Sequence, residues 1–182
     1  MILTNWLRKS RRTAAALTLY NAVVRHARTP DFYLRLGVPD TVDGRFDMIA
    51  LHVYLVLRRL GRADDEDKRF AQALFDAMFM DLDRNLREMG AGDLSIGRKV
   101  KGLAAAFYGR IQAYDAGLEA GDGALDEALR RNLFRKSKPA SWQVAAMTAY
   151  LQGQVRASEA WETPRLRAGE VAFGPPPEGE GA

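Results

Sequence analysis

The fold depends first on Val38-Pro39-Asp40-Thr41-Val42-Asp43-Gly44-Arg45-Phe46, a polar turn that leads into the apolar segment Met48-Ile49-Ala50-Leu51-His52-Val53-Tyr54-Leu55-Val56-Leu57. If this segment is helical, its apolar residues cover nearly the whole circumference. A helix of this kind is typical of a protein interior, where neighbouring elements cover every face. The sequence therefore predicts a buried central helix from Arg45 to about Leu60, and Gly61 is its expected end.

Further helices are predicted on both sides of this segment, because apolar residues recur there every three or four positions. Pro30 and the glycines at 90, 92, 121 and 123 separate these segments. Asp93 or Ser95 is expected to cap the helix that follows residue 92. The predicted fold is all-α, a single irregular bundle of about six helices, with the remaining helices expected at residues 13–27, 68–89, 93–118, 124–135 and from 140 to beyond 151.

The chain is expected to divide into three parts. Residues 1–12 form a basic and apolar N-terminal arm, and residues 13–160 form the helical domain. Residues 161–182 are rich in proline and glycine, as in Gly174-Pro175-Pro176-Pro177, and are predicted to be a disordered, flexible tail.

Composition limits the class of protein. The 182 residues fit one domain, and the absence of cysteine is typical of a reducing compartment. The longest apolar run is about half of the roughly 20 residues that a membrane-spanning helix needs. The sequence therefore predicts a cytoplasmic protein that is soluble, or peripheral at the inner face of the cytoplasmic membrane.

Basic residues are concentrated near the N-terminus, where Arg8, Lys9, Arg11 and Arg12 follow Trp6 and precede every acidic residue. Such a segment suits contact with an anionic membrane surface or with RNA. The other interpretation is an exposed helix with a solvated basic face.

Catalytic and metal-binding patterns are sparse. The histidines, His26 and His52, lie outside zinc-binding spacings, and no phosphate-binding loop or nucleophile motif is present. Asp76, Asp81 and Asp83 share one predicted helix, but a second aspartate-rich helix for magnesium and diphosphate is missing. We therefore expect no catalytic residue, metal, cofactor or small-molecule substrate. A helical enzyme acting on a prenyl or quinone-like substrate is the weakest alternative.

An ordered set of short blocks resembles the ubiquinol-cytochrome c chaperone family between Tyr20 and about Leu151. The blocks follow one another without large insertions, and their order is more specific than any one of them. They are Phe32-Tyr33, the turn of residues 38–46 with the apolar segment after it, Leu51-His52-Val53, Leu74-Phe75-Asp76-Ala77-Met78-Phe79-Met80-Asp81, Arg87-Glu88-Met89-Gly90, Val100-Lys101, Phe107-Tyr108 and Tyr114-Asp115.

The resemblance implies an all-helical, cofactor-free assembly factor that binds newly synthesised cytochrome b and supports assembly of the ubiquinol-cytochrome c reductase complex. Mitochondrial members of the family act at the ribosome exit with a smaller partner protein. The short N-terminal arm favours a bacterial-type member. A ribosome, an anionic membrane surface and a small partner protein are further expected contacts. The alternative is a peripheral membrane or ribosome/RNA-binding adaptor that acts through the basic arm.

Candidate client-binding residues match the family blocks and carry groups that could contact a partner. The aromatic and Met-rich stripe of residues 74–80 fits a core face as well as a binding groove, and Met80 points away from the main stripe. The candidates are Asp40, Arg45, His52, Met80, Asp81, Arg84, Lys101, Tyr108, Tyr114 and Asp115.

Overall fold

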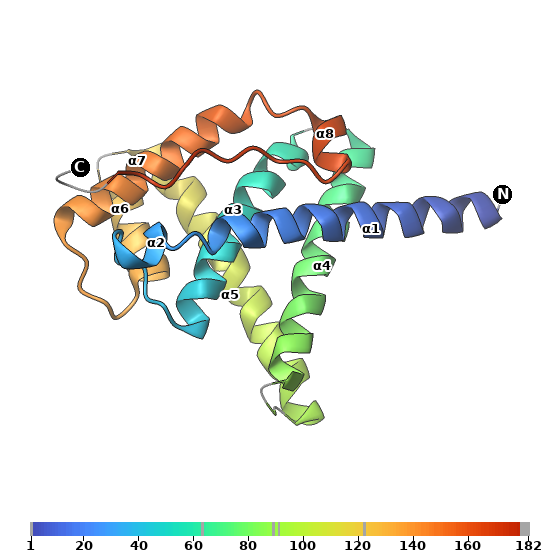
Figure 1. Ribbon diagram of the computed structural model, residues 1–182, viewed down its shortest axis with the longest axis horizontal. Coiled ribbons are helices and arrows are strands. Elements are labelled where there is room, and N and C mark those ends of the chain that lie inside the picture. The colour runs from blue at the N-terminus through green and yellow to red at the C-terminus, as the bar shows by residue number, and fades with distance from the viewer. Residues whose placement is uncertain (1, 63, 89, 91, 122, 179–182) are drawn as a thin grey trace.

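The computed structural model describes residues 2–62, 64–88, 90, 92–121 and 123–178, and for residues 2–8, 93 and 94 it describes the backbone alone. Over these ranges the secondary structure is helical without strands, so the prediction of an all-α bundle is confirmed (Figure 1). The elements in chain order are α1 (Ile2–Ala27), α2 (Asp31–Leu34), α3 (Val42–Gly61), α4 (Asp65–Glu88), α5 (Asp93–Ala120), α6 (Ala124–Leu129), the π-helical turn η1 (Arg130–Phe134), α7 (Ser141–Ser158) and α8 (Thr163–Arg167).

The central position predicted for the apolar helix is confirmed. Every residue of α3 from Phe46 to Val56 is buried, and α3 packs against α1, α4, α5 and α7. Helices α4 and α5 form an antiparallel pair, and the end of α4 and the start of α5 project away from the rest of the bundle (Figure 1). This projection leaves the ends of both helices less covered than their middles.

The polar turn before α3 determines where that helix begins. Thr41 is the N-cap, and its Oγ1 accepts a hydrogen bond of 3.1 Å from the backbone N–H of Gly44. A Cβ at Gly44 would lie 1.9 Å from the carbonyl oxygen of Pro39. Only glycine therefore allows the turn to fold back so closely on the first turn of α3.

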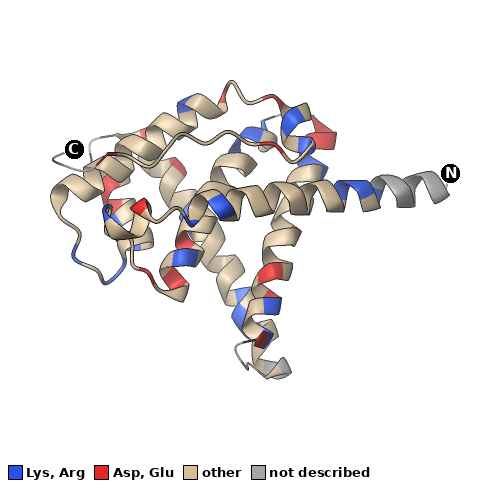
Figure 2. Cartoon of the chain, in the orientation of Figure 1, with Lys and Arg blue, Asp and Glu red and all other residues tan. Residues whose placement is uncertain are grey.

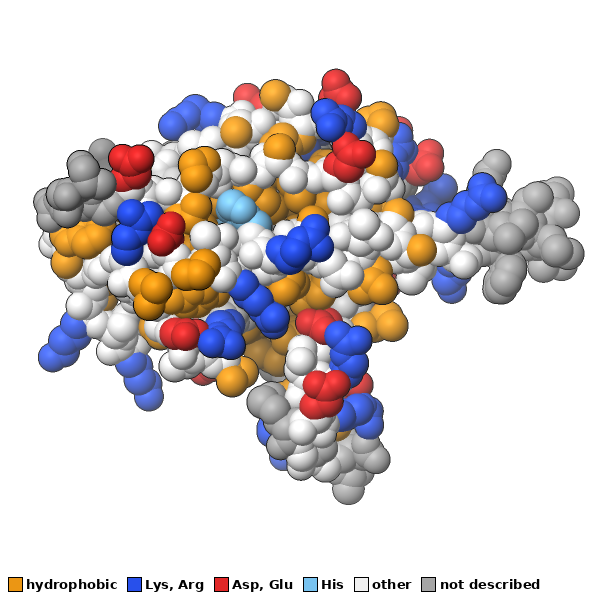
Figure 3. Space-filling view, viewed as in Figure 1, with side chains coloured by type: hydrophobic (Ala, Val, Ile, Leu, Met, Phe, Trp, Pro, Cys, Tyr) orange, Lys and Arg blue, Asp and Glu red, His pale blue; other side chains and the backbone are white. Residues whose placement is uncertain are grey.

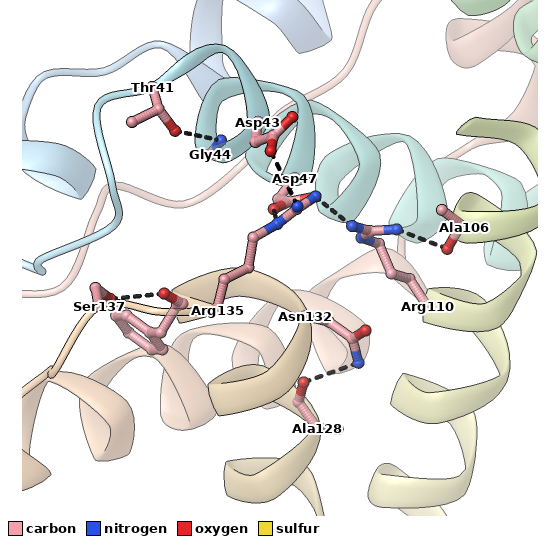
Figure 4. A network of polar contacts seen from close by, with 11 residues as sticks. Thr41, Asp43, Gly44, Asp47, Ala106, Arg110, Ala128, Asn132, Arg135 and Ser137 are labelled. Carbon is pink, nitrogen blue, oxygen red and sulfur yellow. Dashed lines mark hydrogen bonds and ion pairs between the residues drawn. The ribbon is translucent and has the colours of Figure 1, made fainter. Parts of the chain in front are cut away.

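A buried ionic network joins α3 to α5 and to the residue that follows η1 (Figure 4). Asp47 has 0% of its surface exposed and accepts hydrogen bonds from the guanidinium groups of Arg110, at 2.7 Å, and Arg135, at 2.9 Å. Arg135 also pairs with Asp43 at 3.2 Å, and Arg110 lies over the ring of Phe46. Burial raises the pKa of Asp47, and the two guanidinium groups oppose that rise.

Both histidines belong to a second network, in which His52 is buried and His26 is partly exposed. The carbonyl of Met48 can only accept, so the Nδ1 of His52, 2.8 Å away, carries the hydrogen. The Nε2 of His52 then accepts from the hydroxyl of Tyr150 at 2.8 Å, and that hydroxyl accepts from the Nε2 of His26 at 2.9 Å. Burial lowers the pKa of His52 to about 3 and also lowers the pKa of His26.

The C-terminal segment requires a correction, because residues 161–178 pack on the bundle rather than forming a flexible tail. Residues 163–167 form α8 with Leu166 buried, and the chain then returns in extended form between α1 and α7 (Figure 1). Phe173 stacks on His26 with ring centroids 4.8 Å apart, and the backbone N–H of Gly174 donates to Gln154 at 3.1 Å. Residues 179–182 of the predicted tail lie outside the described residues.

Several predicted boundaries also change. Residues 2–12 continue into α1 without interruption, so the backbone shows no boundary after residue 12. Helix α4 begins at Asp65, before the expected start at residue 68, and Asp67 is buried and pairs with Arg167. The N-cap position of α5 is Gly92, without a side-chain hydrogen bond, so the expected caps Asp93 and Ser95 both lie inside the helix. Short helix α2 was not predicted.

The described part of the chain contains neither a candidate membrane span nor a candidate metal site. None of its helices combines the length and hydropathy needed to cross a bilayer. It also holds no group of three or more histidine, cysteine, aspartate or glutamate side chains placed to bind a metal ion.

Candidate functional site

An open groove of about 640 Å³ lies between the start of α3 and the projecting ends of α4 and α5. Hydrophobic side chains are visible in the hollow between the body and the α4–α5 projection (Figure 3). The end of α1 closes one side. The lining residues are Tyr20, Arg28, Val42, Asp43, Arg45, Phe46, Ile49, Asp81, Leu82, Asn85, Leu86, Glu88, Lys99, Gly102 and Leu103.

The floor of the groove is apolar. Phe46 and Ile49 of α3 are buried beneath it, whereas Val42, at the first position of α3, has 66% of its surface exposed. Leu82 and Leu86 of α4 face the same space and are partly covered. Because α4 and α5 extend past the elements that cover them, the apolar stripe of α4 continues beyond the core and becomes surface. Apolar surface of this kind marks binding sites in many proteins.

The rim of the groove is charged. Arg45 pairs with Asp40 at 2.6 Å, and this bond lowers the pKa of Asp40 and raises that of Arg45. Asp81 accepts from the hydroxyl of Tyr20 at 3.0 Å and from Arg84 at 2.5 Å. Burial, followed by the nearby charge of Asp81, raises the pKa of Tyr20. Four predicted residues, Asp40, Arg45, Asp81 and Arg84, therefore lie along or beside the groove.

A second exposed feature is aromatic. Met80 and Tyr108 have 67% and 53% of their surfaces exposed, on α4 and α5 respectively. The ring of Tyr108 lies 5.5 Å from that of Phe75, which packs with Phe79 at 4.5 Å. Neither Met80 nor Tyr108 is part of the groove lining. These two predicted residues are accessible and lie outside the groove lining.

Three other predicted residues make contacts within the fold. His52 has 0% of its surface exposed and bonds Met48 and Tyr150. Tyr114 is also buried, and its hydroxyl has no hydrogen-bond partner in the described part of the chain. Asp115 accepts from Tyr54 at 2.7 Å and pairs with Arg58. The two buried side chains are therefore corrected from candidate partner contacts to core residues.

The remaining predicted residues lie elsewhere. Lys101 is exposed on α5 beside the groove-lining Gly102. Lys9 and Arg11 are exposed on α1, and Arg12 is partly covered. The side chains of Trp6 and Arg8 lie outside the described residues.

The profile of the "Ubiquinol-cytochrome C chaperone" family matches residues 34–173, which include all of α3, α4, α5 and α7. The chain belongs to this family. The match covers most of the groove lining and begins after the end of α1.

Relatives of this family member are assembly factors by name. It is 26% identical over 162 residues to the "Ubiquinol-cytochrome-c reductase complex assembly factor 1" of Xenopus laevis, covering 88% of this chain and 81% of the relative. The human protein of that name is also 26% identical, and the chain spans 54% of its length. The "Crystal structure of the Cbp3 homolog from Brucella abortus" superposes with a TM-score of 0.80 at 35% identity, covering 95% of this chain and 96% of that one.

Much of the groove of this chaperone-family chain was not predicted. Leu82, Leu86 and Leu103 lie on helical stripes that the sequence assigns to the core, and the structure leaves them partly covered at the ends of those stripes. The sequence places Val42 in the polar turn and Phe46 at the start of the buried helix, and neither position predicts a binding groove. One feature of the sequence did point to the groove. The apolar stripe of α4 is longer than the part of α4 that the neighbouring helices cover.

Proposed function

We propose that this chain is a chaperone that binds newly synthesised cytochrome b and supports its assembly into the ubiquinol-cytochrome c reductase complex. The observation that carries the proposal is the match of residues 34–173 to the ubiquinol-cytochrome c chaperone family. The names of the relatives, which are assembly factors for this complex, support it further.

The apolar groove is the proposed client site. A newly made membrane protein presents apolar segments before they are packed, and an amphipathic or apolar helix can lay such a face into a hydrophobic groove. Val42, Leu82 and Leu86 would contact the segment, and the charged rim, with Arg45 and Asp81, would border it. The exposed surface of Val42 would become buried against the client.

The proposed activity is binding without catalysis. Histidine is the side chain best suited to acid–base chemistry near neutral pH, but His52 is buried, and His26 and His52 both form hydrogen bonds with Tyr150. In the groove, Asp81 is held by Tyr20 and Arg84, so its carboxylate has a structural role there. These contacts favour a surface that holds a client.

Affinity capture tests this function. The tagged protein is purified from its native host after mild crosslinking, and cytochrome b peptides are counted against those captured by an unrelated basic helical protein. Specific enrichment of cytochrome b is the expected result. If folded bait captures none beside an active cytochrome complex, the chain has some other client and the proposal is wrong.

A further inference from the structure

A second cleft, of about 570 Å³, lies at the end of the molecule where α1, the start of α4 and α8 meet. Figure 2 shows basic segments of α1 and α8 near this end. Four of the seven lining residues are arginines. The lining consists of Arg11, Arg12, Ala15, Glu66, Arg69, Phe70 and Arg167.

The four arginines of the cleft carry more positive charge than the acidic side chains beside them neutralise. Arg167 is held in place by Glu66 at 3.3 Å and by the buried Asp67 at 3.4 Å. Arg11, Arg12 and Arg69 have no ion-pair partner among the described side chains. Like charges gathered around one cavity repel each other, so a bound anion would relieve that repulsion.

The guanidinium groups of the cleft favour a phosphate as the bound anion. A guanidinium group is a planar fork of N–H donors that matches a phosphate group bidentately. Arg167 is already oriented by its two carboxylate partners, so less side-chain freedom is lost when a phosphate binds. The cleft is open to solvent on the outside of the bundle, which suits a phosphate that stays attached to a larger body.

We infer that this cleft binds the phosphate of an anionic phospholipid headgroup and holds the protein against a membrane surface. The residues that precede the cleft on α1 favour a lipid over a free phosphate, because the sequence there places Trp6 and Leu7 beside Arg8 and Lys9. Segments that combine apolar and basic residues in this way bind at the membrane interface. The inference does not depend on the client groove, which is lined by different residues.

Vesicle co-sedimentation tests the site. The variant Arg11→Ala/Arg69→Ala removes two exposed, unpaired charges, and Lys136→Ala/Lys138→Ala is its control. The control removes the same charge from an exposed loop outside the cleft. One basic residue near an anionic surface changes partitioning about fivefold, so binding of the cleft variant to phosphatidylglycerol-containing vesicles should weaken by about 25-fold. The control variant should bind like the wild type, and neutral phosphatidylcholine vesicles should bind none of the proteins.

Equal binding by the two double variants would overturn the site. Saturation of the cleft by inorganic phosphate, without vesicle binding, would identify a soluble phosphate and overturn the lipid source. If the wild type bound single-stranded RNA but not vesicles, and the cleft variant lost this RNA binding, the membrane interpretation would be overturned. The cleft variant should unfold at the wild-type temperature because both of its side chains are exposed.

Discussion

Substitution of Asp47 by alanine is expected to destabilise the protein strongly, because it removes the anion from a buried ionic network. Arg110, with 8% of its side chain exposed, would keep a charge that water can scarcely reach. Arg135 is less affected because 32% of its side chain is exposed. Removing one partner of a buried ion pair costs about 3–5 kcal/mol.

This loss can be measured by urea unfolding. With a urea dependence of about 2 kcal/mol per molar, the midpoint should fall by about 1.5–2.5 M. Asp40→Ala is the matched control, because Asp40 also pairs with an arginine, Arg45, but does so on the surface. Exposed pairs contribute little to stability, so the control should keep the wild-type midpoint.

A second variant separates the loss of attraction from the cost of an unpaired cation. Adding Arg110→Met to Asp47→Ala removes the buried charge, and this change should restore part of the lost stability. If Asp47→Ala shifts the midpoint no more than Asp40→Ala does, Asp47 is not a buried charge held by two arginines, and the reasoning is refuted.

Three further substitutions test the packing around α3. Gly44→Ala places a Cβ against the carbonyl of Pro39 and should cost about 3 kcal/mol, lowering the melting temperature by about 6–12 °C; an unchanged melting temperature would contradict the close turn. Burial lowers the pKa of His52 to about 3. As the pH falls below the usual histidine pKa, about 6.5, the His52 side chain takes up a proton in the unfolded chain but stays neutral in the folded chain. From pH 7 to pH 5 this histidine should therefore cost about 2 kcal/mol of stability, and urea unfolding of His52→Gln should show a weaker pH dependence than the wild type. Phe173→Ala removes a partly covered ring stacked on His26 and should lower the melting temperature by about 4–8 °C; no change would mean that the C-terminal segment is not docked in solution.

The long helices could be predicted because their residues carry local signals. The apolar run from Met48 to Leu57 predicted the central helix, and the three- and four-residue spacing from Leu74 to Leu86 predicted α4. Both patterns depend on neighbours in the sequence, which helix geometry brings to one face.

The ionic network could not be predicted in this way. Asp47 sits at the start of a helix where acids are common, and its partner Arg135 is 88 residues away. Nothing local distinguishes it from a solvated acid such as Asp43. The docked C-terminal segment was missed for a related reason, because Leu166, Val171 and Phe173 are too widely spaced to form a pattern.

The groove was missed because a stripe of apolar residues does not show where its cover ends. Leu82 and Leu86 continue the stripe that buries Leu74 and Met78, yet they line a surface. The family blocks did lead to the rim, since Arg45 and Asp81 were selected from them. His52 and Tyr114 were selected on the same basis but are core residues.

The most direct test of the client groove places one charge in it. Val42→Asp should preserve folding, because Val42 is 66% exposed and an acidic residue is favourable in the first turn of a helix. Leu34→Asp is the control, since Leu34 is 81% exposed and lies outside the groove. Crosslinked cytochrome b captured from the native host is counted for each variant.

Val42→Asp should reduce capture by about tenfold or more, because its carboxylate would be buried against apolar client side chains. Leu34→Asp should capture as much cytochrome b as the wild type. Equal capture by all three proteins, each confirmed to be folded, would contradict the groove as the site where the client is held.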